Sequence, residues 1–479
     1  MGSLKKNVIY QTAYQILTII LPFVTSPYVS RVLGAENLGI YSYTYSIASY
    51  FVLFAMLGIA NYGNRSIAMV RDDQNKLNRT FSGIFVVHSA VSLIVILFYV
   101  VYLVILVREN QIIAVIQTVY IIAALLDINW FYFGIEQFKI TVTRNTIVKL
   151  LTVVSIFLFI RSKDDLWIYV TIMAFGSFLS QSLVWLFLRK YVSFVKPTFA
   201  EMKKHIKPML VLFIPVLAIS LYKVMDKIML GNMCAKAQVG FYENSEKAIN
   251  IPNSVIGAFG TVMLPKMSNL LNTGKEKEGR KYMNLSMKYI MIVSFGLAFG
   301  LAAVSDIFSV VFWGEEFRPS GILIAILAMT VPFLAFANVI RTQHLIPMCQ
   351  DKEYTISVFV GAGVNLLFNI ILIPQYQAVG AALGTLFAEV SVCVIQAFFV
   401  RKDLPLAMYL KNCVFFILAG VVMYTAVYAL NLIMSESVLS LALEIAAGGV
   451  VFVALSAVYL WVTKDDFFRK TVKKYLRRS

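Results

Sequence analysis

Three charged residues lie within the strongly apolar stretch IPVLAISLYKVMDKIMLG, residues 214–231. Lys223 and Lys227 share one helix face at i, i+4 spacing, and Lys223 can reach Asp226 at i, i+3. A charge that faces lipid at mid-depth costs roughly 3 kcal/mol, so such a cluster is expected to face a bundle interior or water. The alternative for Lys227, four residues before Gly231, is that its stem extends to the membrane interface. The sequence leaves both interpretations open.

Polar residues also run along one helix face of other apolar stretches. In VGFYENSEKAINIPNSVIGAFG, residues 239–260, they are Glu243, Glu246, Lys247, Asn250 and Ser254. In the first apolar stretch they are Asn7, Gln11, Gln15, Thr18, Pro22 and Thr25. Side chains three or four residues apart lie on one face of a helix. Such stripes either line a cavity or hold neighbouring helices together.

Two isolated ions have competing interpretations. Asp127 lies deep in a predicted span, with Trp130 one turn later. It forms either a structural pair with a nearby cation or a site for a proton or another cation. Arg341 lies near the inner end of another span, where its side chain can extend to the interface.

The composition places the chain in a membrane. Hydrophobic residues make up 59% of the 479 residues and charged residues 14%, and the mean hydropathy is +0.78. A spanning helix needs roughly 20 mostly apolar residues, and the chain contains many such stretches. The sequence predicts an all-α integral membrane protein with about 14 transmembrane helices.

The basic residues predict the orientation. Most of the 42 Lys and Arg residues fall in loops on one side, which is expected to be cytoplasmic. Both termini are then cytoplasmic, and the net charge of +17 reflects loops that face anionic membrane lipids. Nucleic acid is not an expected partner. The basic tail, residues 463–479, is predicted to form an amphipathic surface helix, with Thr463 and Asp466 as a capping pair.

Weak internal matches indicate two similar halves. Leu33, Gly34, Gly39 and Tyr41 match Leu230, Gly231, Gly240 and Tyr242, and the four glycines are expected to serve as turn residues at the outer rim. Transporters are often built from such repeats. The predicted divisions are an N-terminal six-helix bundle over 1–190, a cytoplasmic linker over 191–208 with a capped helix at Thr198 and Glu201, a parallel six-helix bundle over 209–402, two additional transmembrane helices over 403–462, and the tail over 463–479.

Three stretches carry a resemblance to a known family. They are PFVTSPYVSRVLGAENLGIYSYTYSI, DINWFYFGIEQFKITVTRN and MDKIMLG followed by VGFY. They resemble polysaccharide repeat-unit flippases of the Wzx type, in the superfamily that also contains multidrug and lipid II exporters. The resemblance covers essentially the whole chain, and it implies a central cleft between the two bundles.

The resemblance also suggests which residues form a site. The family cleft is lined chiefly by the first, second, seventh and eighth spans, which here have the longest polar stripes. Cations in a cleft bind phosphate oxygens strongly. The substrate-binding candidates are Arg31, Arg65, Lys223, Lys227, Lys247, Asn250, Gln11 and Arg341. The candidates for a coupling ion are Asp127, Asp226 and Glu246.

The implied substrate is an oligosaccharide linked through pyrophosphate to undecaprenol, which is moved from the inner to the outer leaflet of the bacterial plasma membrane by alternating access for capsule or O-antigen export. The sequence has no P-loop, and no cofactor, metal or catalytic residue is expected. The coupling ion is then a proton or sodium. A polysaccharide polymerase and other export proteins are possible partners.

Other functions remain as alternatives. A cation-coupled multidrug exporter would favour carboxylates over lysines in its cleft, and a flippase for lipid II or teichoic-type precursors would share the superfamily. A membrane glycan polymerase or ligase would be an enzyme, which usually needs a large extracytoplasmic loop. The predicted outward loops are short, so a transporter is favoured over an enzyme.

Overall fold

The computed structural model describes the backbone of residues 2–476 and the side chains of residues 17–18, 20–221 and 223–473. Within that part of the chain all regular secondary structure is helical. The chain divides into two compact units, Met1–Glu243 and Asn244–Ser479. This agrees with the predicted all-α membrane class.

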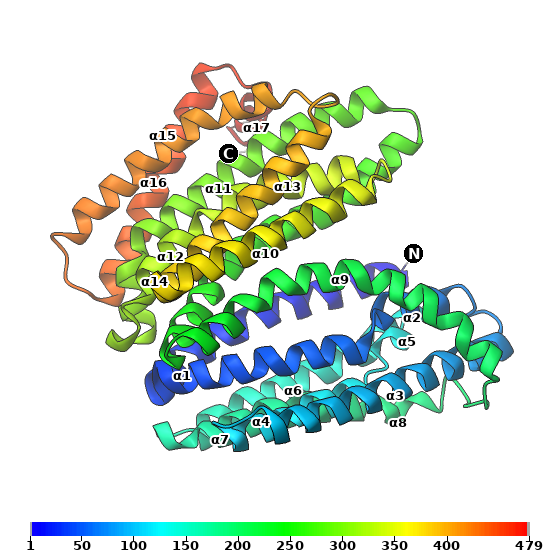
Figure 1. Ribbon diagram of the computed structural model, residues 1–479. Coiled ribbons are helices and arrows are strands. Elements are labelled where there is room, and N and C mark those ends of the chain that lie inside the picture. Colours follow the sequence, from blue (N-terminus) through cyan, green and yellow to red (C-terminus); the bar gives the residue numbers. More distant parts are fainter. Residues whose placement is uncertain (1, 477–479) are drawn as a thin grey trace. The chain divides into compact units, whose positions relative to one another are not determined.

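The described residues of unit 1 form nine α-helices, one short 3-10 helix and the start of a further helix. Helix α1 contacts α3, α4, α6, α7 and α9, and α4 also packs on α7 (Figure 1). Helix α9, which the sequence assigned to the second bundle, packs on α1, α2 and α3 in this unit. The elements are α1 (Gly2–Met56), α2 (Ile59–Ala68), α3 (Gln74–Ile105), α4 (Gln111–Leu125), α5 (Asn129–Gly134), α6 (Phe138–Phe159), η1 (Lys163–Asp165), α7 (Leu166–Leu183), α8 (Trp185–Leu188), α9 (Phe199–Met233) and the beginning of α10 (Lys236–Asn272).

Unit 2 is organised around α11, which contacts α12, α13, α15 and α16. Helix α14 packs on α12 and α13. The elements after α10 are α11 (Glu276–Trp313), η2 (Glu315–Phe317), α12 (Ser320–Ala328), α13 (Thr330–Ile340), the π-helix η3 (Arg341–Leu345), α14 (Asp351–Val400), α15 (Leu406–Asn431), α16 (Val438–Val462) and α17 (Asp466–Leu476).

Eleven helical stretches in the described part of the chain are long and apolar enough to cross a membrane. Two of them, Ile20–Ala68 and Asp351–Val400, have 49 and 50 residues, more than twice the roughly 20 that one crossing needs. Each contains a residue with non-helical backbone, Gly34 with φ 79° and Gln377 with φ 52°. A positive φ interrupts a right-handed helix. The chain is therefore a multi-pass membrane protein, and the count of 14 stays a prediction.

The DINWFYFG sequence forms a buried aromatic cluster in unit 1. Helix α5 buries Trp130, Phe131 and Tyr132 against α2 and α3. A Cβ at Gly63 would lie 2.5 Å from the Trp130 ring, so the absence of a side chain on α2 lets the indole pack directly on its backbone. This packing fixes the short helix that follows Asp127.

Helix α9 begins where the sequence predicts. The Thr198 hydroxyl accepts a hydrogen bond from the Glu201 N–H at 3.3 Å, and the Glu201 carboxylate accepts one from the Thr198 N–H at 2.8 Å. This reciprocal capping box satisfies two N–H groups at the helix start. The prediction of a capped helix is confirmed. The helix does not end in the loop but runs without interruption to Met233.

The predicted tail helix is confirmed as α17, but its predicted cap is wrong. The Asp465 carboxylate, at the position before the helix, accepts a hydrogen bond from the Phe468 N–H at 2.9 Å. The Thr463 hydroxyl instead donates to the Tyr459 carbonyl in the preceding helix. Asp465 also pairs with Lys288 at 2.5 Å and accepts from the Tyr289 hydroxyl at 2.9 Å. One carboxylate therefore both caps α17 and fastens it to α11.

The attachment of α17 is expected to weaken in acid. Burial alone would raise the pKa of Asp465, but the hydrogen bonds from Lys288, Phe468 and Tyr289 outweigh it and hold that pKa below its ordinary value. A carboxylate whose pKa is lower in the folded than in the unfolded state stabilises the folded protein at pH values above its unfolded-state pKa of about 3.9. This contribution is lost as the pH falls through the folded-state pKa. Hydrogen exchange of the α17 amides should be unchanged from neutral pH to about pH 5, after correction for intrinsic rates, and accelerate below about pH 4.

The matched variant for this prediction is Asp465→Asn, which cannot titrate. It should show faster exchange in α17 at neutral pH and no further step in acid. An acid step of equal size in the variant would assign the effect to another group.

Candidate functional site

A group of charged and hydroxyl side chains joins α1, α9 and α10 in unit 1. We call Ser42, Asp226, Lys227, Tyr242 and Glu243 the charge cluster. The Lys227 ammonium and the Ser42 hydroxyl both donate to the same Glu243 carboxylate oxygen, at 3.0 and 2.8 Å. The Tyr242 hydroxyl donates to the buried Asp226 carboxylate at 2.7 Å. The cluster thus brings one cation and two carboxylates together between helices of unit 1, each with a partner.

The hairpin formed by α9 and α10 explains these partners. Its turn lies between Met233 and Lys236, and residues at equal distances on either side of a turn meet on antiparallel helices. Both pairs, Lys227 with Glu243 and Asp226 with Tyr242, are separated by 16 residues. Asp226 and Lys227 of α9 are therefore matched by Tyr242 and Glu243 at the start of α10.

Close backbone packing brings α1 onto this hairpin. A Cβ on Gly39 would collide with the Lys236 carbonyl, and one on Gly240 with the Ala35 carbonyl. A Cβ on Gly231 would collide with the Tyr43 ring. The expectation that all four glycines of the repeat lie in turns is wrong: only Gly34 has a positive φ, whereas the other three lie inside helices. Because these glycines have no side chain, the helices can pack closely at these positions.

Four tyrosines lie next to the charge cluster, and we call them the tyrosine cluster. They come from α1, α4 and α7 and are Tyr41, Tyr45, Tyr120 and Tyr169. Tyr41 stacks on Tyr45 with ring centroids 5.7 Å apart, and Tyr120 lies edge-on to Tyr45 at 5.0 Å. Tyr45 is within electrostatic range of Lys227 and Glu243, and the residue is 39% exposed. Tyrosine offers an apolar face and a hydroxyl at its tip, so the two clusters combine charge with aromatic surface.

The other predicted cations of unit 1, which lie among the described residues, are exposed. Lys223, one turn before Lys227, is exposed and makes no hydrogen bond or ion pair within the described residues. The expected contact between Lys223 and Asp226 is therefore not formed. Arg31 is exposed on α1 just before its break, and Arg65 is exposed on α2. The side chain of Gln11 lies outside the described residues.

The remaining candidates belong to unit 2. Lys247 donates to the Asn244 side chain at 3.0 Å, Asn250 is exposed, and Glu246 is half-buried. Arg341 opens the π-helix η3 and donates to the Tyr354 hydroxyl at 3.4 Å. A π-helix is rare and is frequently found at functional sites. The participation of these four residues in one binding site stays a prediction.

Asp127 lies in the break between α4 and α5. Its carboxylate accepts from the Asn129 N–H at 2.8 Å and from the Gln181 amide at 3.1 Å. The guanidinium of Arg144 donates to the Asn129 side chain at 3.0 Å. Asp127 thus accepts from the first N–H of α5 and joins a polar network in which Asn129 links it to a cation. A role in ion coupling stays a prediction for Asp127, Asp226 and Glu246.

Sequence reasoning overlooked the partners of the predicted ions. Glu243 was recognised only as part of a stripe, and Tyr242 only as part of a repeat, although both complete the charge cluster. The signal that could have found them is their position relative to the turn after Met233. The tyrosine cluster left no comparable signal, because its members come from three helices that are distant in the sequence.

The comparisons with known proteins agree with this architecture. Residues 4–271 match the family described as polysaccharide biosynthesis protein. A protein of Escherichia coli (strain K12) to which O-antigen transport is ascribed is 25% identical over 409 residues, which cover 84% of this chain and 97% of that protein. The capsular polysaccharide biosynthesis protein CapF of Staphylococcus aureus is 22% identical over 414 residues, which cover 83% and 99%.

Solved structures show the same fold. The lipid II flippase MurJ in an inward closed conformation superposes with a TM-score of 0.80 at 14% identity, covering 95% of this chain and 99% of that one. A crystal structure of MATE in complex with MaL6 has a TM-score of 0.51 at 11% identity, covering 85% of this chain and 97% of that one. The family match extends over more than half of the chain. The chain therefore belongs to the Wzx-like polysaccharide biosynthesis family, whose members are membrane transporters of the flippase type rather than enzymes.

Proposed function

We propose that this chain moves undecaprenyl-pyrophosphate-linked oligosaccharide repeat units from the inner to the outer leaflet of the plasma membrane for export of a capsule or O-antigen type of polysaccharide. The observation that supports this most is the adjacency of the charge and tyrosine clusters in unit 1. A lipid-linked glycan needs a polar path for its sugars and pyrophosphate, while its polyprenyl chain stays in the bilayer.

The two clusters fit different parts of that substrate. Lys227 is a cation that phosphate oxygens can bind, provided that they compete with Glu243 for it. The tyrosine rings present flat apolar faces, on which the C–H faces of sugar rings can pack, and hydroxyls that can hydrogen-bond to sugar hydroxyls. Exchange of Lys227 between Glu243 and a phosphate would allow binding without leaving a buried cation unpaired.

Alternating access is the mechanism that we propose. The Glu243–Lys227 pair would be present when the site is empty and would be replaced by a substrate contact when it is loaded, so that substrate binding changes the interactions between helices. A change of conformation requires such a difference in binding between two states. A proton or sodium gradient would supply the energy.

Deleting the gene in its native host tests the function. Surface glycan should be lost while undecaprenyl-pyrophosphate oligosaccharide accumulates, facing the cytoplasm, as measured by lipid extraction and by lectin accessibility in spheroplasts. A plasmid-borne copy should restore export. Loss of the lipid-linked precursor itself would indicate an assembly enzyme. Arrest of lipid II or teichoic-type precursors, or altered sensitivity to cationic drugs with normal surface glycan, would indicate the other superfamily functions.

A further inference from the structure

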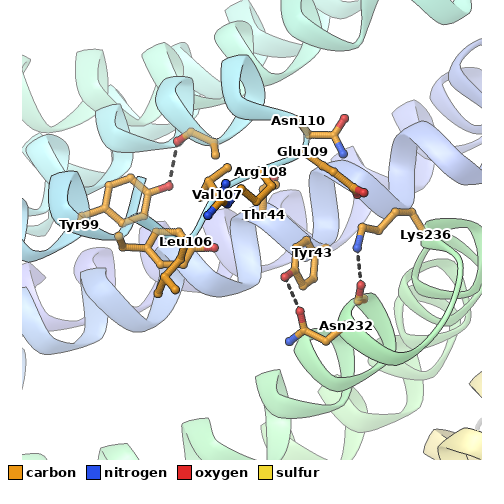
Figure 2. A pocket seen from close by; sticks show the side chains of 13 residues that line it. Tyr43, Thr44, Tyr99, Leu106, Val107, Arg108, Glu109, Asn110, Asn232 and Lys236 are labelled. Atoms are coloured by element: carbon orange, nitrogen blue, oxygen red, sulfur yellow. Dashed lines mark hydrogen bonds between the residues drawn. The ribbon is translucent and has the colours of Figure 1, made fainter. Parts of the chain in front are cut away.

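A polar pocket lies in unit 1, beside residues of α1 that are not part of the charge cluster. Its volume is about 230 Å³, far above the roughly 10–15 Å³ that one water molecule needs. It is bounded by α1 after the Gly34 break, by the connection between α3 and α4, and by the turn between α9 and α10 (Figure 2). We call it the rim pocket, because the basic-residue pattern predicts that this end of the unit is extracytoplasmic.

One side of the rim pocket is aromatic, and its rings are held in place. The Tyr43 hydroxyl donates to the Asn232 side chain at 2.6 Å, and the Tyr99 hydroxyl donates to the Ala114 carbonyl at 2.8 Å. Tyr102 packs on Tyr99 with ring centroids 5.6 Å apart. Aromatic rings that are fixed in this way form a preorganised surface, which reduces the entropy lost when a ligand binds.

The other side presents polar groups that have no protein partner. Within the described residues, the side chains of Arg108, Glu109 and Asn110 make no hydrogen bond, and the amide nitrogen of Asn232 makes none. Asn110 adopts φ 52° at the start of α4, a conformation that asparagine tolerates better than most residues. Figure 2 shows that Glu109 and Lys236 extend from opposite walls toward the same space. Donors and acceptors therefore converge in the pocket.

We propose that the rim pocket binds one sugar ring of the transported oligosaccharide. A sugar hydroxyl both donates and accepts hydrogen bonds, which suits a pocket containing a guanidinium, a carboxylate and two amides. The C–H face of the ring can pack on Tyr43 and Tyr102, whereas Tyr99 is only 1% exposed and packs on Tyr102. The pocket also holds two cations, Arg108 and Lys236. The Lys236 ammonium already donates to the Gly231 carbonyl, and the Glu109 carboxylate opposes an anion, so an uncharged sugar fits better than a phosphate group. The subsite rests on the proposed function, in which it would hold the glycan at the extracytoplasmic end of the transport path.

Sugar binding to the rim pocket can be measured without a transport assay. The full-length protein is reconstituted in nanodiscs free of glycoside detergents, and a panel of free hexoses and N-acetylhexosamines is observed by saturation-transfer NMR. Wild type should transfer saturation to ring C–H protons of at least one sugar. Glu109→Gln combined with Asn232→Ala should weaken binding about 3-fold to 10-fold, since one neutral hydrogen bond is worth about 0.5–1.5 kcal/mol. Asn110→Gly, which keeps the backbone conformation, should weaken it in the same direction.

Glu36→Gln is the matched control, because Glu36 is an exposed carboxylate near the α1 break that does not line the pocket. Its sugar signals should equal those of wild type. The subsite is rejected if no sugar gives a ring-proton signal, if the pocket variants bind as wild type does, or if sodium pyrophosphate displaces the sugar. If the subsite is rejected but export is arrested in the deletion strain, the proposed function is retained. Sugar binding together with normal export in that strain rejects the proposed function instead.

Discussion

Gly39→Ala and Gly240→Ala are each expected to destabilise unit 1 strongly. The added Cβ at Gly39 would overlap the Lys236 carbonyl, and that at Gly240 would overlap the Ala35 carbonyl. Neither obstacle is the end of a flexible side chain, so α1 and the hairpin would have to move apart. Overpacking typically costs 1–3 kcal/mol and occasionally more. We expect about 3 kcal/mol for each variant, at the upper end of that range.

The measurement is the thermal midpoint of the purified protein together with its abundance in the membrane. Gly257→Ala is the control on the same helix, since a Cβ there meets nothing within 4 Å. It should be neutral or slightly stabilising, because alanine is a better helix former than glycine. If Gly39→Ala melts as wild type does, the close contact between α1 and α10 is not a feature of the folded protein.

Removing either member of the Lys227–Glu243 pair is expected to have the second large effect. The side chains are 16% and 21% exposed, so each single variant, Lys227→Met or Glu243→Gln, leaves a mostly buried charge without its ion-pair partner. Breaking a fully buried pair costs about 3–5 kcal/mol, and partial exposure reduces our expectation to roughly 2 kcal/mol. Membrane abundance should fall in both variants.

The double variant separates structure from transport. Lys227→Met with Glu243→Gln removes both charges, so abundance should return close to that of wild type. Export of surface glycan should nevertheless remain about 10-fold to 100-fold lower, because a hydrogen bond to a charged group is worth about 1.5–3 kcal/mol. Export that recovers with abundance would show that Lys227 is structural and does not handle substrate. The double variant is compared with Lys223→Ala, which removes an exposed lysine on the same helix face.

The sequence was sufficient for features that depend on neighbouring residues. Hydropathy predicted the membrane class, and the Thr198–Glu201 spacing predicted the start of α9, because both signals are local. The tail helix was predicted as well, but two acidic residues stand together at its start. The hydrogen bond from the Phe468 N–H identifies Asp465 as the cap, and its contacts with Lys288 and Tyr289 on α11 depend on tertiary packing.

The candidate site was predicted less completely, because its partners are brought together by tertiary packing. The charges of α9 were recognised, but Lys223 was expected to pair with Asp226 on the same helix. Tyr242 takes that position instead, since the antiparallel hairpin brings it to the carboxylate. The repeat glycines were found correctly and their role was misread, because glycine serves equally in turns and in helix contacts. Backbone dihedral angles and neighbouring atoms were needed to distinguish the two.

The ion pair between Lys227 and Glu243 across the hairpin also has a consequence for biogenesis. When the ribosome has delivered α9, the counter-charge of Lys227 is still 16 residues away in the unfinished chain, and an unneutralised ammonium resists entry into lipid. The translocon would therefore retain α9 until α10 arrives and release the two as one inserted unit. A truncation that ends after the turn at residue 235 should then leave α9 poorly integrated, despite its apolar character.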